Sequence, residues 1–280
     1  MALTLDEINR FPVKSLRGQA LTESIVEPWG LAGDRRWLVV DADGALITAR
    51  EYPRMLLVTP TLRADGGLEF AGPDAAPLHV APADGPLVDV RVWKSELQAT
   101  LADDHGWFGD LLGVPARLVY LDDPTRRHPN PRFARPDDYV SFADGYPLLL
   151  TTTASLDALN DLILEGPRSD EGPLPMVRFR PSVVVRGSEP WAEDGWRSVR
   201  IGDAVFRAVK GCDRCVMTTT DADTAARGKE PIATLARHRR WDGATWFGMS
   251  LVPDSPGATI RVGDEVEVLY AEPAPDGPPR

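Results

Sequence analysis

Proline and glycine constrain this 280-residue chain most strongly, because 26 prolines and 24 glycines recur throughout it and interrupt its apolar runs. The runs between them are short and rich in β-branched residues, which favours strands and turns over long helices. Three pairs of runs predict hairpins: residues 37–40 with 45–48, 199–201 with 205–209, and 260–262 with 266–269. The expected fold class is therefore mainly β or α+β.

Apolar residues at helical spacing are confined to short segments, and they predict helices over residues 103–112, 156–164 and 231–239. The segment 122–138 is rich in proline, arginine and aspartate and is typical of an exposed loop or linker. We therefore expect a first domain over residues 1–121 and a second over residues 122–270. Residues 271–280 are rich in proline and predict a disordered tail.

Charge and cysteine content exclude several classes of protein. The chain has 31 basic and 42 acidic side chains and a net charge of −11, which disfavours nucleic acid and anionic lipid as partners. The first ten residues include acids and lack an apolar run, and no apolar run is long enough to cross a membrane. Two cysteines are too few for a disulfide-stapled secreted fold. We expect a cytoplasmic protein with no membrane partner.

Both cysteines lie in one Cys-x-x-Cys motif, Cys212 to Cys215, which is compatible with several chemistries. A structural zinc ion would need further ligands from histidines or carboxylates. A thioredoxin-like redox pair would open a helix, whereas residues 216–220 are predicted to form a strand. A thiolate could instead bind a soft metal, and the charges of Lys210 and Arg214 would favour that thiolate. Two ordinary buried cysteines would show the same spacing.

Other segments carry groups that can hold anions. Lys14 and Ser15 follow an extended Phe-Pro-Val segment, and an ammonium beside a hydroxyl can hold an anionic oxygen. Arg35 and Arg180 lie near predicted strand ends, where a guanidinium can clamp a phosphate or a polar ring. Residues 151–155 precede a predicted helix and offer hydroxyls and free N–H groups. Solvated side chains and plain helix capping would explain the same patterns.

Taken in order, these segments resemble the MOSC family (molybdenum-cofactor sulfurase C-terminal domain). They are most similar to its two-part members, the amidoxime-reducing components of mitochondria and their bacterial relatives. The resemblance covers roughly residues 3–270 and is carried by the segments FPVKS (11–15), GLAGDRRWLVVD (30–41), TAREYPRM (48–55), YPLLLTTTASLDALN (146–160), RFRPSVVV (178–185), CDRCVMTTTDADTAARGKEPIATL (212–235), FG (247–248) and RVGDEVEVL (261–269).

The resemblance implies a MOSC N-terminal β-barrel-like domain packed on a MOSC β-barrel domain, with a molybdenum cofactor (Mo-molybdopterin) between them. Cys215 matches the family's molybdenum ligand and catalytic position. The resemblance also assigns a set of cofactor-binding positions: Lys14, Ser15, Arg35, Thr152, Ser155, Arg180 and Ser182. Three positions depart from the family pattern. Ser182 replaces a frequent asparagine, Thr153 replaces a frequent acid, and Asp213 replaces a small residue.

By the same resemblance, the protein is expected to be a molybdenum-dependent oxidoreductase that reduces small N-hydroxylated compounds. A [2Fe–2S] cluster needs four cysteines and the chain has two. We therefore expect electrons from a separate protein: a ferredoxin, a flavodoxin, or a cytochrome b5-like protein with its reductase. The alternative is a carrier of sulfur or of molybdenum cofactor, with Cys215 as persulfide carrier or ligand. A zinc-stabilised binding module is a third reading.

Overall fold

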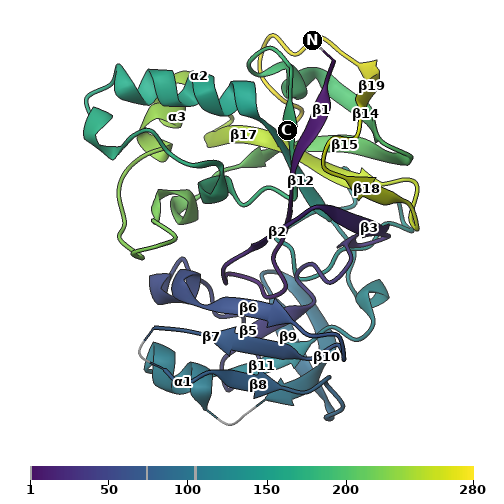
Figure 1. Ribbon diagram of the computed structural model, residues 1–280, viewed down its shortest axis with the longest axis vertical. Helices are drawn as coiled ribbons and strands as arrows, with labels where there is room; N and C mark the ends of the chain where they lie inside the picture. The colour runs from purple at the N-terminus through teal and green to yellow at the C-terminus, as the bar shows by residue number, and fades with distance from the viewer. Residues whose placement is uncertain (1, 74, 104–105) are drawn as a thin grey trace.

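The computed structural model describes residues 2–73, 75–103 and 106–280. Figure 1 shows two halves stacked along the long axis, with both chain termini in the upper half. The upper half carries the longest helix and the largest sheet, and the lower half is built from shorter sheets. Strands dominate both halves, which confirms the predicted mainly β, α+β fold class.

A nine-stranded sheet organises the upper half. All of its pairings are antiparallel except the parallel pair β12–β13. Its apolar face packs around Phe206, Leu251 and Val199, which are fully buried. Its strands, in spatial order, are β19 (Val266–Ala271), β14 (Trp196–Ile201), β15 (Ala204–Asp213), β17 (Ala244–Pro253), β12 (Leu148–Thr152), β13 (Val183–Arg186), β1 (Thr4–Arg10) and β2 (Gln19–Leu21), with β16 (Arg240–Trp241) paired to β17.

Strands β1 to β4 belong to this upper half, although they come from the opposite end of the chain, whereas Val13 and Leu16 between β1 and β2 pack into the core of the lower half. Strand β1 pairs with β13, and β3 (Glu23–Glu27) pairs with both β4 (Gly30–Leu31) and β18 (Thr259–Arg261). The chain therefore enters the upper half, touches the lower half between β1 and β2, crosses to it again after β4, and returns later. The division at residues 121 and 122 stays a prediction.

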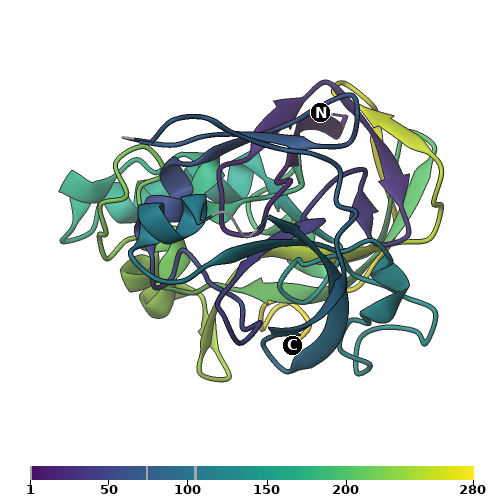
Figure 2. The same ribbon diagram turned by 90° about the horizontal axis from the view of Figure 1, so that it is seen from below.

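The lower half combines two sheets with a common core. Trp37, Phe70 and Phe108 are almost completely buried there, and the rings of Phe70 and Phe108 meet edge to face at 5.1 Å. Figure 2 shows from below that strands of this half bend around rather than lie flat. The two sheets are formed by β5 (Trp37–Val40), β11 (Arg117–Tyr120), β10 (Ser95–Asp103) and β9 (Leu87–Val92), and by β6 (Thr59–Leu62), β7 (Leu68–Ala71) and β8 (Leu78–Val80).

The three predicted helices are present with shifted ends: α1 (Trp107–Leu112), α2 (Thr153–Leu164) and α3 (Ile232–His238). The prediction that the first helix begins at Asp103 is wrong, because strand β10 continues through that residue. Residues 104 and 105, which were part of the same prediction, lie outside the described residues. Helix α2 begins earlier than predicted because the Thr152 side chain accepts a hydrogen bond from Ser155 N and caps the helix.

The hairpin predictions had different outcomes. The pair β14–β15 is a hairpin as predicted. The prediction for residues 260–269 is wrong: β18 pairs with β3 and β19 pairs with β14, because distant apolar partners outweigh the local turn. The hairpin predicted for residues 37–40 with 45–48 is present in part: Val40 and Leu46 form an antiparallel bridge, and Ile47 N donates to Val39 O (2.9 Å), but β5 pairs along its whole length with β11. Residues 216–219 form a 3₁₀ turn, η6 (Val216–Thr219), instead of the predicted strand.

Three further features complete the fold. Within the described residues, the strand pairings do not close any sheet into a ring. Residues 272–280 lie against the molecule, since Gly211 N donates a hydrogen bond to Pro279 O (2.8 Å), and the disorder of this tail in solution stays a prediction. None of the helices in the described chain is long and apolar enough to traverse a bilayer.

Candidate functional site

A cleft of about 400 Å³ is lined by residues from both halves of the molecule. It brings together five of the predicted site residues, which the sequence separates by up to 201 positions: Lys14, Ser15, Arg35, Arg180 and Cys215. The remaining three, Thr152, Ser155 and Ser182, are fully buried and are not part of its lining. The cleft is therefore the candidate site, and segments that are distant in the sequence form it together.

The lining is basic, although the protein as a whole is acidic. Asp144 and Asp213 are the two acidic residues of the described lining, and the basic residues are Lys14, Arg35, Arg50, Arg178, Arg180, Lys210 and Arg214. Concentrating cations in a cleft of a protein with a net charge of −11 is electrostatically costly unless an anion offsets them. The cleft is thus suited to an anionic ligand.

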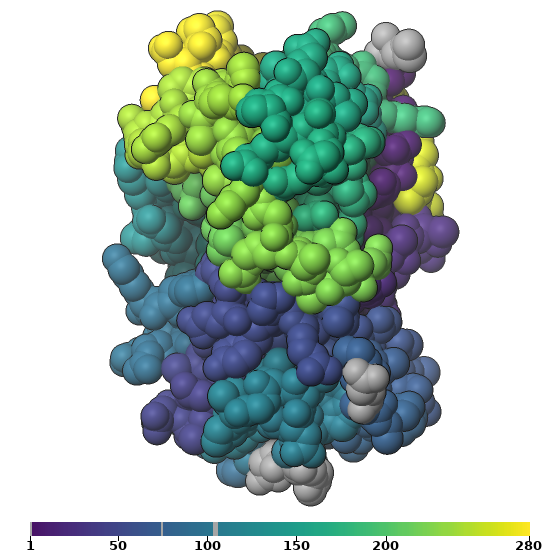
Figure 3. Space-filling view, turned by 90° about the vertical axis from the view of Figure 1, so that its left-hand side faces the viewer, coloured from purple at the N-terminus to yellow at the C-terminus, as the bar shows by residue number. Residues whose placement is uncertain are grey.

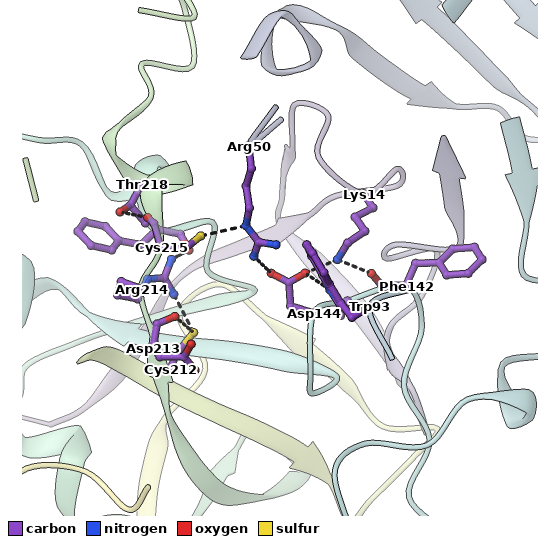
Figure 4. Close-up of polar contacts among 12 residues, drawn as sticks. Lys14, Arg50, Trp93, Phe142, Asp144, Cys212, Asp213, Arg214, Cys215 and Thr218 are labelled. Atoms are coloured by element: carbon purple, nitrogen blue, oxygen red, sulfur yellow. Dashed lines mark hydrogen bonds and ion pairs between the residues drawn. The ribbon is translucent and has the colours of Figure 1, made fainter. Parts of the chain in front are cut away.

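Asp144 links the two sides of the cleft. Its carboxylate accepts hydrogen bonds from Lys14 Nζ, from Arg50 Nη2 (3.1 Å) and from Trp93 Nε1 (3.2 Å) (Figure 4). Desolvation by the cleft walls opposes ionisation of this carboxyl, but Lys14 and Arg50 outweigh it and hold the pKa of Asp144 below its usual range. Burial lowers the pKa of Lys14 to about 8, against the opposing attraction of Asp144.

Each cysteine sulfur lies within hydrogen-bond distance of one arginine guanidinium. Arg50 Nε lies 3.2 Å from Cys215 Sγ, and Arg214 Nη1 lies 2.9 Å from Cys212 Sγ. Burial raises the pKa of the Cys212 thiol, while the charge of Arg214 opposes that rise. Figure 4 shows Arg50 between Cys215 and Asp144, and Arg214 between the two cysteines. Cys215 is half-buried at the start of η6, and its sulfur is the soft donor of the cleft.

Two arginines stack on one aromatic ring at another part of the cleft. The guanidinium carbons of Arg35 and Arg180 lie 4.5 and 4.1 Å from the Phe11 ring centroid. Arg35 pairs with Asp34 (2.5 Å), and its Nη1 lies 3.5 Å from Ser182 Oγ. Among the described residues, no hydrogen bond or ion pair reaches the Arg180 guanidinium. Burial, then the charge of Arg35, lowers the pKa of Arg180, which remains a cation at neutral pH.

The backbone of the cleft is unusual. Four lining residues, Ser15, Arg35, Trp93 and Arg180, have left-handed backbone with φ between 48° and 68°. Residues other than glycine seldom adopt this conformation, and it persists where the surrounding structure imposes it, commonly at functional sites. These residues give the cleft a fixed shape, and the pattern was not visible in the sequence.

The hydroxyls of Thr152 and Ser155 contact a buried carboxyl of the protein itself. Ser155 Oγ lies 2.8 Å and Thr152 Oγ1 lies 3.2 Å from Glu193 Oε2, and Glu193 is fully buried. Burial, then the charge of Asp194, raises the pKa of Glu193 to about 7. Thr152 thus caps α2, and the hydroxyls of Thr152 and of Ser155 in its first turn both contact the Glu193 carboxyl. A role for them in holding a cofactor stays a prediction.

The segment after Cys215 ties the two halves together. Arg17 Nη2 pairs with Asp223 Oδ1 (2.7 Å), and Arg227 Nη2 donates to Arg50 O (2.8 Å). Figure 3 shows this segment, in yellow-green, resting on the violet-blue surface of the lower half. This segment therefore contacts the backbone of Arg50, the residue whose guanidinium faces the Cys215 sulfur.

Sequence reasoning missed Arg50, Asp144 and Trp93 as site residues. Arg50 lies in the segment TAREYPRM, but nothing in its local pattern set it apart from a surface arginine. For the zinc reading, no group of three histidine, cysteine, aspartate or glutamate side chains that could bind a metal was found within residues 2–73, 75–103 and 106–280. His105, one possible zinc ligand, lies outside these ranges.

Comparisons with known proteins agree with the earlier resemblance. Residues 2–115 match the MOSC N-terminal beta barrel domain, and residues 137–267 match the MOSC domain. The chain is 32% identical to mitochondrial amidoxime-reducing component 1 of Mus musculus, over 95% of this chain and 82% of that protein. The Homo sapiens protein of the same name is 31% identical, over 95% and 83%.

A larger protein and a solved structure are also similar. Molybdenum cofactor sulfurase of Oryza sativa subsp. japonica is 30% identical over 88% of this chain and 32% of that protein. The crystal structure of the YUAD protein from Bacillus subtilis covers 95% of this chain and 94% of its own, with 12% identity and a TM-score of 0.43. The domain matches and the relatives at 30% identity or more confirm the resemblance, and the chain therefore belongs to the MOSC family.

Proposed function

We propose that this protein is a molybdenum-cofactor-binding oxidoreductase that reduces small N-hydroxylated compounds with electrons from a separate protein. One observation carries the proposal: the Cys215 sulfur lies in the same basic cleft as Lys14, Arg35 and the Arg180 guanidinium, which forms no hydrogen bond or ion pair with the described residues. A soft thiolate donor together with anion-binding groups matches a cofactor that has a metal, a polar ring and a phosphate. The relatives named for amidoxime reduction support the same class of substrate.

The residues of the cleft fit such a cofactor. Arg180 has no partner among the described residues, so its donors are available for a phosphate or a pterin edge. The cleft volume of about 400 Å³ is in the range of ordinary ligand sites. Ser15, Arg35 and Arg180 are held in left-handed backbone, which orients their groups before any ligand arrives. We propose that Lys14, Ser15, Arg35 and Arg180 anchor the cofactor and that Cys215 is the metal ligand.

When bound, the cofactor would supply a metal that exchanges two electrons and accepts an oxygen atom. The net reaction is R–NHOH + 2 electrons + 2 protons → R–NH₂ + H₂O. The protein's contribution is binding, orientation and charge. Arg50 Nε donates a hydrogen bond to the Cys215 sulfur and so places a positive charge beside the proposed metal ligand. Asp144 fixes Arg50 and Lys14 relative to each other, which keeps that donor in place.

A second candidate is a carrier of sulfur or of molybdenum cofactor. It is favoured by the similarity to a molybdenum cofactor sulfurase and by the presence of two thiols, Cys212 and Cys215, in one cleft. In this function Cys215 would hold a persulfide or deliver the cofactor without turnover. Ser182, which touches Arg35 without lining the cleft, would support the cofactor indirectly in either function.

The test is analysis of molybdenum and pterin in protein from a host that makes the cofactor. Wild type, Cys215→Ala and the matched control Cys212→Ala are purified in parallel. We expect near-stoichiometric molybdenum and pterin in wild type, loss of molybdenum and of amidoxime reduction in Cys215→Ala, and retention of both in Cys212→Ala. Wild-type protein with neither molybdenum nor pterin would refute the oxidoreductase. A persulfide on Cys215 in that protein would support the carrier.

The electron source is tested separately. Reduction driven by a chemical reductant is compared with reduction driven by a ferredoxin, a flavodoxin, or a cytochrome b5-like protein with its reductase. We expect one protein donor to support turnover at micromolar concentration. If chemical reductant supports turnover and none of these proteins does, the proposed donor classes are wrong while the oxidoreductase stands.

A further inference from the structure

Residues 276–280, which we call the strap, lie along the end of β15 that lines the cleft. The pairing of β15 with β14 ends at Arg207, whereas β15 continues to Asp213. Past the end of that pairing, Gly211 N donates a hydrogen bond to Pro279 O (2.8 Å). Figure 1 marks the end of the strap, C, in the middle of the upper half. The strap therefore supplies a backbone partner where β14 no longer does.

Contacts of several kinds hold the strap in place. Pro278 is buried, and an added Cβ at Gly211 would lie 2.6 Å from Pro278 Cγ, so a glycine is what permits this close approach. Arg280 Nε donates to Asp242 Oδ2 (2.6 Å), and Arg132 Nη2 donates to Arg280 O (3.0 Å). Chain ends are ordered where contacts of this kind tie them down.

Two tryptophans connect the strap to the wall of the cleft. Gly277 has a φ of +89°, and an added Cβ there would lie 2.8 Å from the Trp241 ring. Trp246 Nε1 donates to Trp241 O (3.0 Å), and Lys210 Nζ lies 4.9 Å from the Trp246 ring centroid. Lys210 and Gly211 both line the cleft. Proline-rich segments dock well on aromatic surfaces of this kind, because their extended backbone loses little entropy on binding.

We propose that the strap fixes the part of the cleft wall formed by residues 210–213, and that its release exposes the Cys212 thiol. Gly211 immediately precedes Cys212, so the hydrogen bond to Pro279 O restrains the backbone beside that thiol. With the strap docked, Cys212 is half-buried and its sulfur lies 2.9 Å from Arg214 Nη1. With the strap released, the end of β15 loses a backbone partner and moves more freely. The inference does not rest on the proposed function.

The test uses three full-length variants. Gly277→Ala undocks the strap, because the new Cβ collides with the Trp241 ring and alanine is strained at this φ. Arg280→Ala removes the ion pair with Asp242. Gly257→Ala is the matched control, since its φ is +95° and the described residues leave open space around the added Cβ.

Two rates are measured on each purified protein: deuterium exchange of the Gly211 amide, and alkylation of Cys212 by iodoacetamide. Trypsin cleaves after Arg214, so mass spectrometry reads Cys212 and Cys215 on separate peptides. Cys215 is the internal reference, because loss of a bound cofactor would expose Cys215, whereas release of the strap acts on Cys212. We expect both rates to rise about tenfold in Gly277→Ala and about two- to fivefold in Arg280→Ala, with no change in Gly257→Ala.

Several results would overturn the proposal. Exchange of the Gly211 amide in wild type at the rate of an unprotected amide would show that the strap is disordered, as its composition predicts. Equal rates in wild type and Gly277→Ala would show that the strap does not restrain β15. Faster amide exchange without faster alkylation of Cys212 would separate the strap from the thiol. Equal increases in Gly277→Ala and Gly257→Ala would indicate a general loss of stability instead.

Discussion

The buried carboxyl of Glu193 is expected to make the stability of the upper half depend on pH, and Glu193→Gln is the perturbation that reveals it. Burial, then the charge of Asp194, raises the pKa of Glu193 to about 7 from an ordinary value of 4.5. A carboxyl whose pKa is raised by folding stabilises the folded state fully below its unfolded pKa. That contribution is lost as pH rises through the folded pKa. The relevant window is therefore pH 4.5 to 7 and slightly above.

The magnitude follows from the shift. At about 1.4 kcal/mol per pKa unit, a rise of about 2.5 units corresponds to roughly 3 kcal/mol lost between pH 4.5 and pH 8. Glutamine keeps an oxygen that can accept from Ser155, but its amide nitrogen replaces Oε1, which has no hydrogen-bond partner among the described residues. An unpartnered amide costs about 1–3 kcal/mol at every pH. Glu193→Gln is thus expected to be less stable than wild type at pH 5. Between pH 5 and pH 8 it is expected to lose much less stability than wild type does.

The assay is urea unfolding at pH 5, 6, 7 and 8, followed for wild type, Glu193→Gln and the exposed control Glu189→Gln. We expect the difference in free energy of unfolding between wild type and Glu193→Gln to change by about 2.5 kcal/mol across this range. The control should follow wild type. Parallel pH profiles for wild type and Glu193→Gln would refute the assignment of a raised pKa to this carboxyl.

Two further predictions test the cleft and the fold. Burial lowers the pKa of Lys14 to about 8, so the cation is present below that pH and is lost above it. Affinity for inorganic phosphate, measured by calorimetry, should fall through pH 8 in wild type but persist to pH 9.5 in Lys14→Arg; parallel declines would contradict this. Gly44→Ala should cost about 2–4 kcal/mol in urea unfolding, because φ is +76° and a Cβ would lie 2.2 Å from Asp89 O. Gly243→Ala, with φ +79° and open space around it, should cost only about 1 kcal/mol, and equal costs would show that the close approach does not matter.

The fold class could be predicted because it depends on local patterns. Short apolar runs separated by proline and glycine are incompatible with long helices, and the β14–β15 hairpin follows from a two-residue turn between two such runs. The predictions that were wrong depended on distant partners. Residues 260–269 have the pattern of a hairpin, yet β18 pairs with β3, more than 230 residues earlier in the chain. Register and pairing of that kind are decided by which faces must be buried together.

The sequence by itself determined a mainly β protein with one Cys-x-x-Cys motif, several potential anion-binding groups and a resemblance to the MOSC family. The tertiary structure decided which of these groups form one site. It placed Lys14, Arg35, Arg180 and Cys215 around a single cleft, and it turned Thr152 and Ser155 toward a buried carboxyl. It also placed Arg50, Asp144 and Trp93 in the cleft, although the local sequence around these residues did not mark them as site residues. The physical reason is that charge, desolvation and contact act through space, so a group acquires its chemical role from neighbours that only the folded chain supplies.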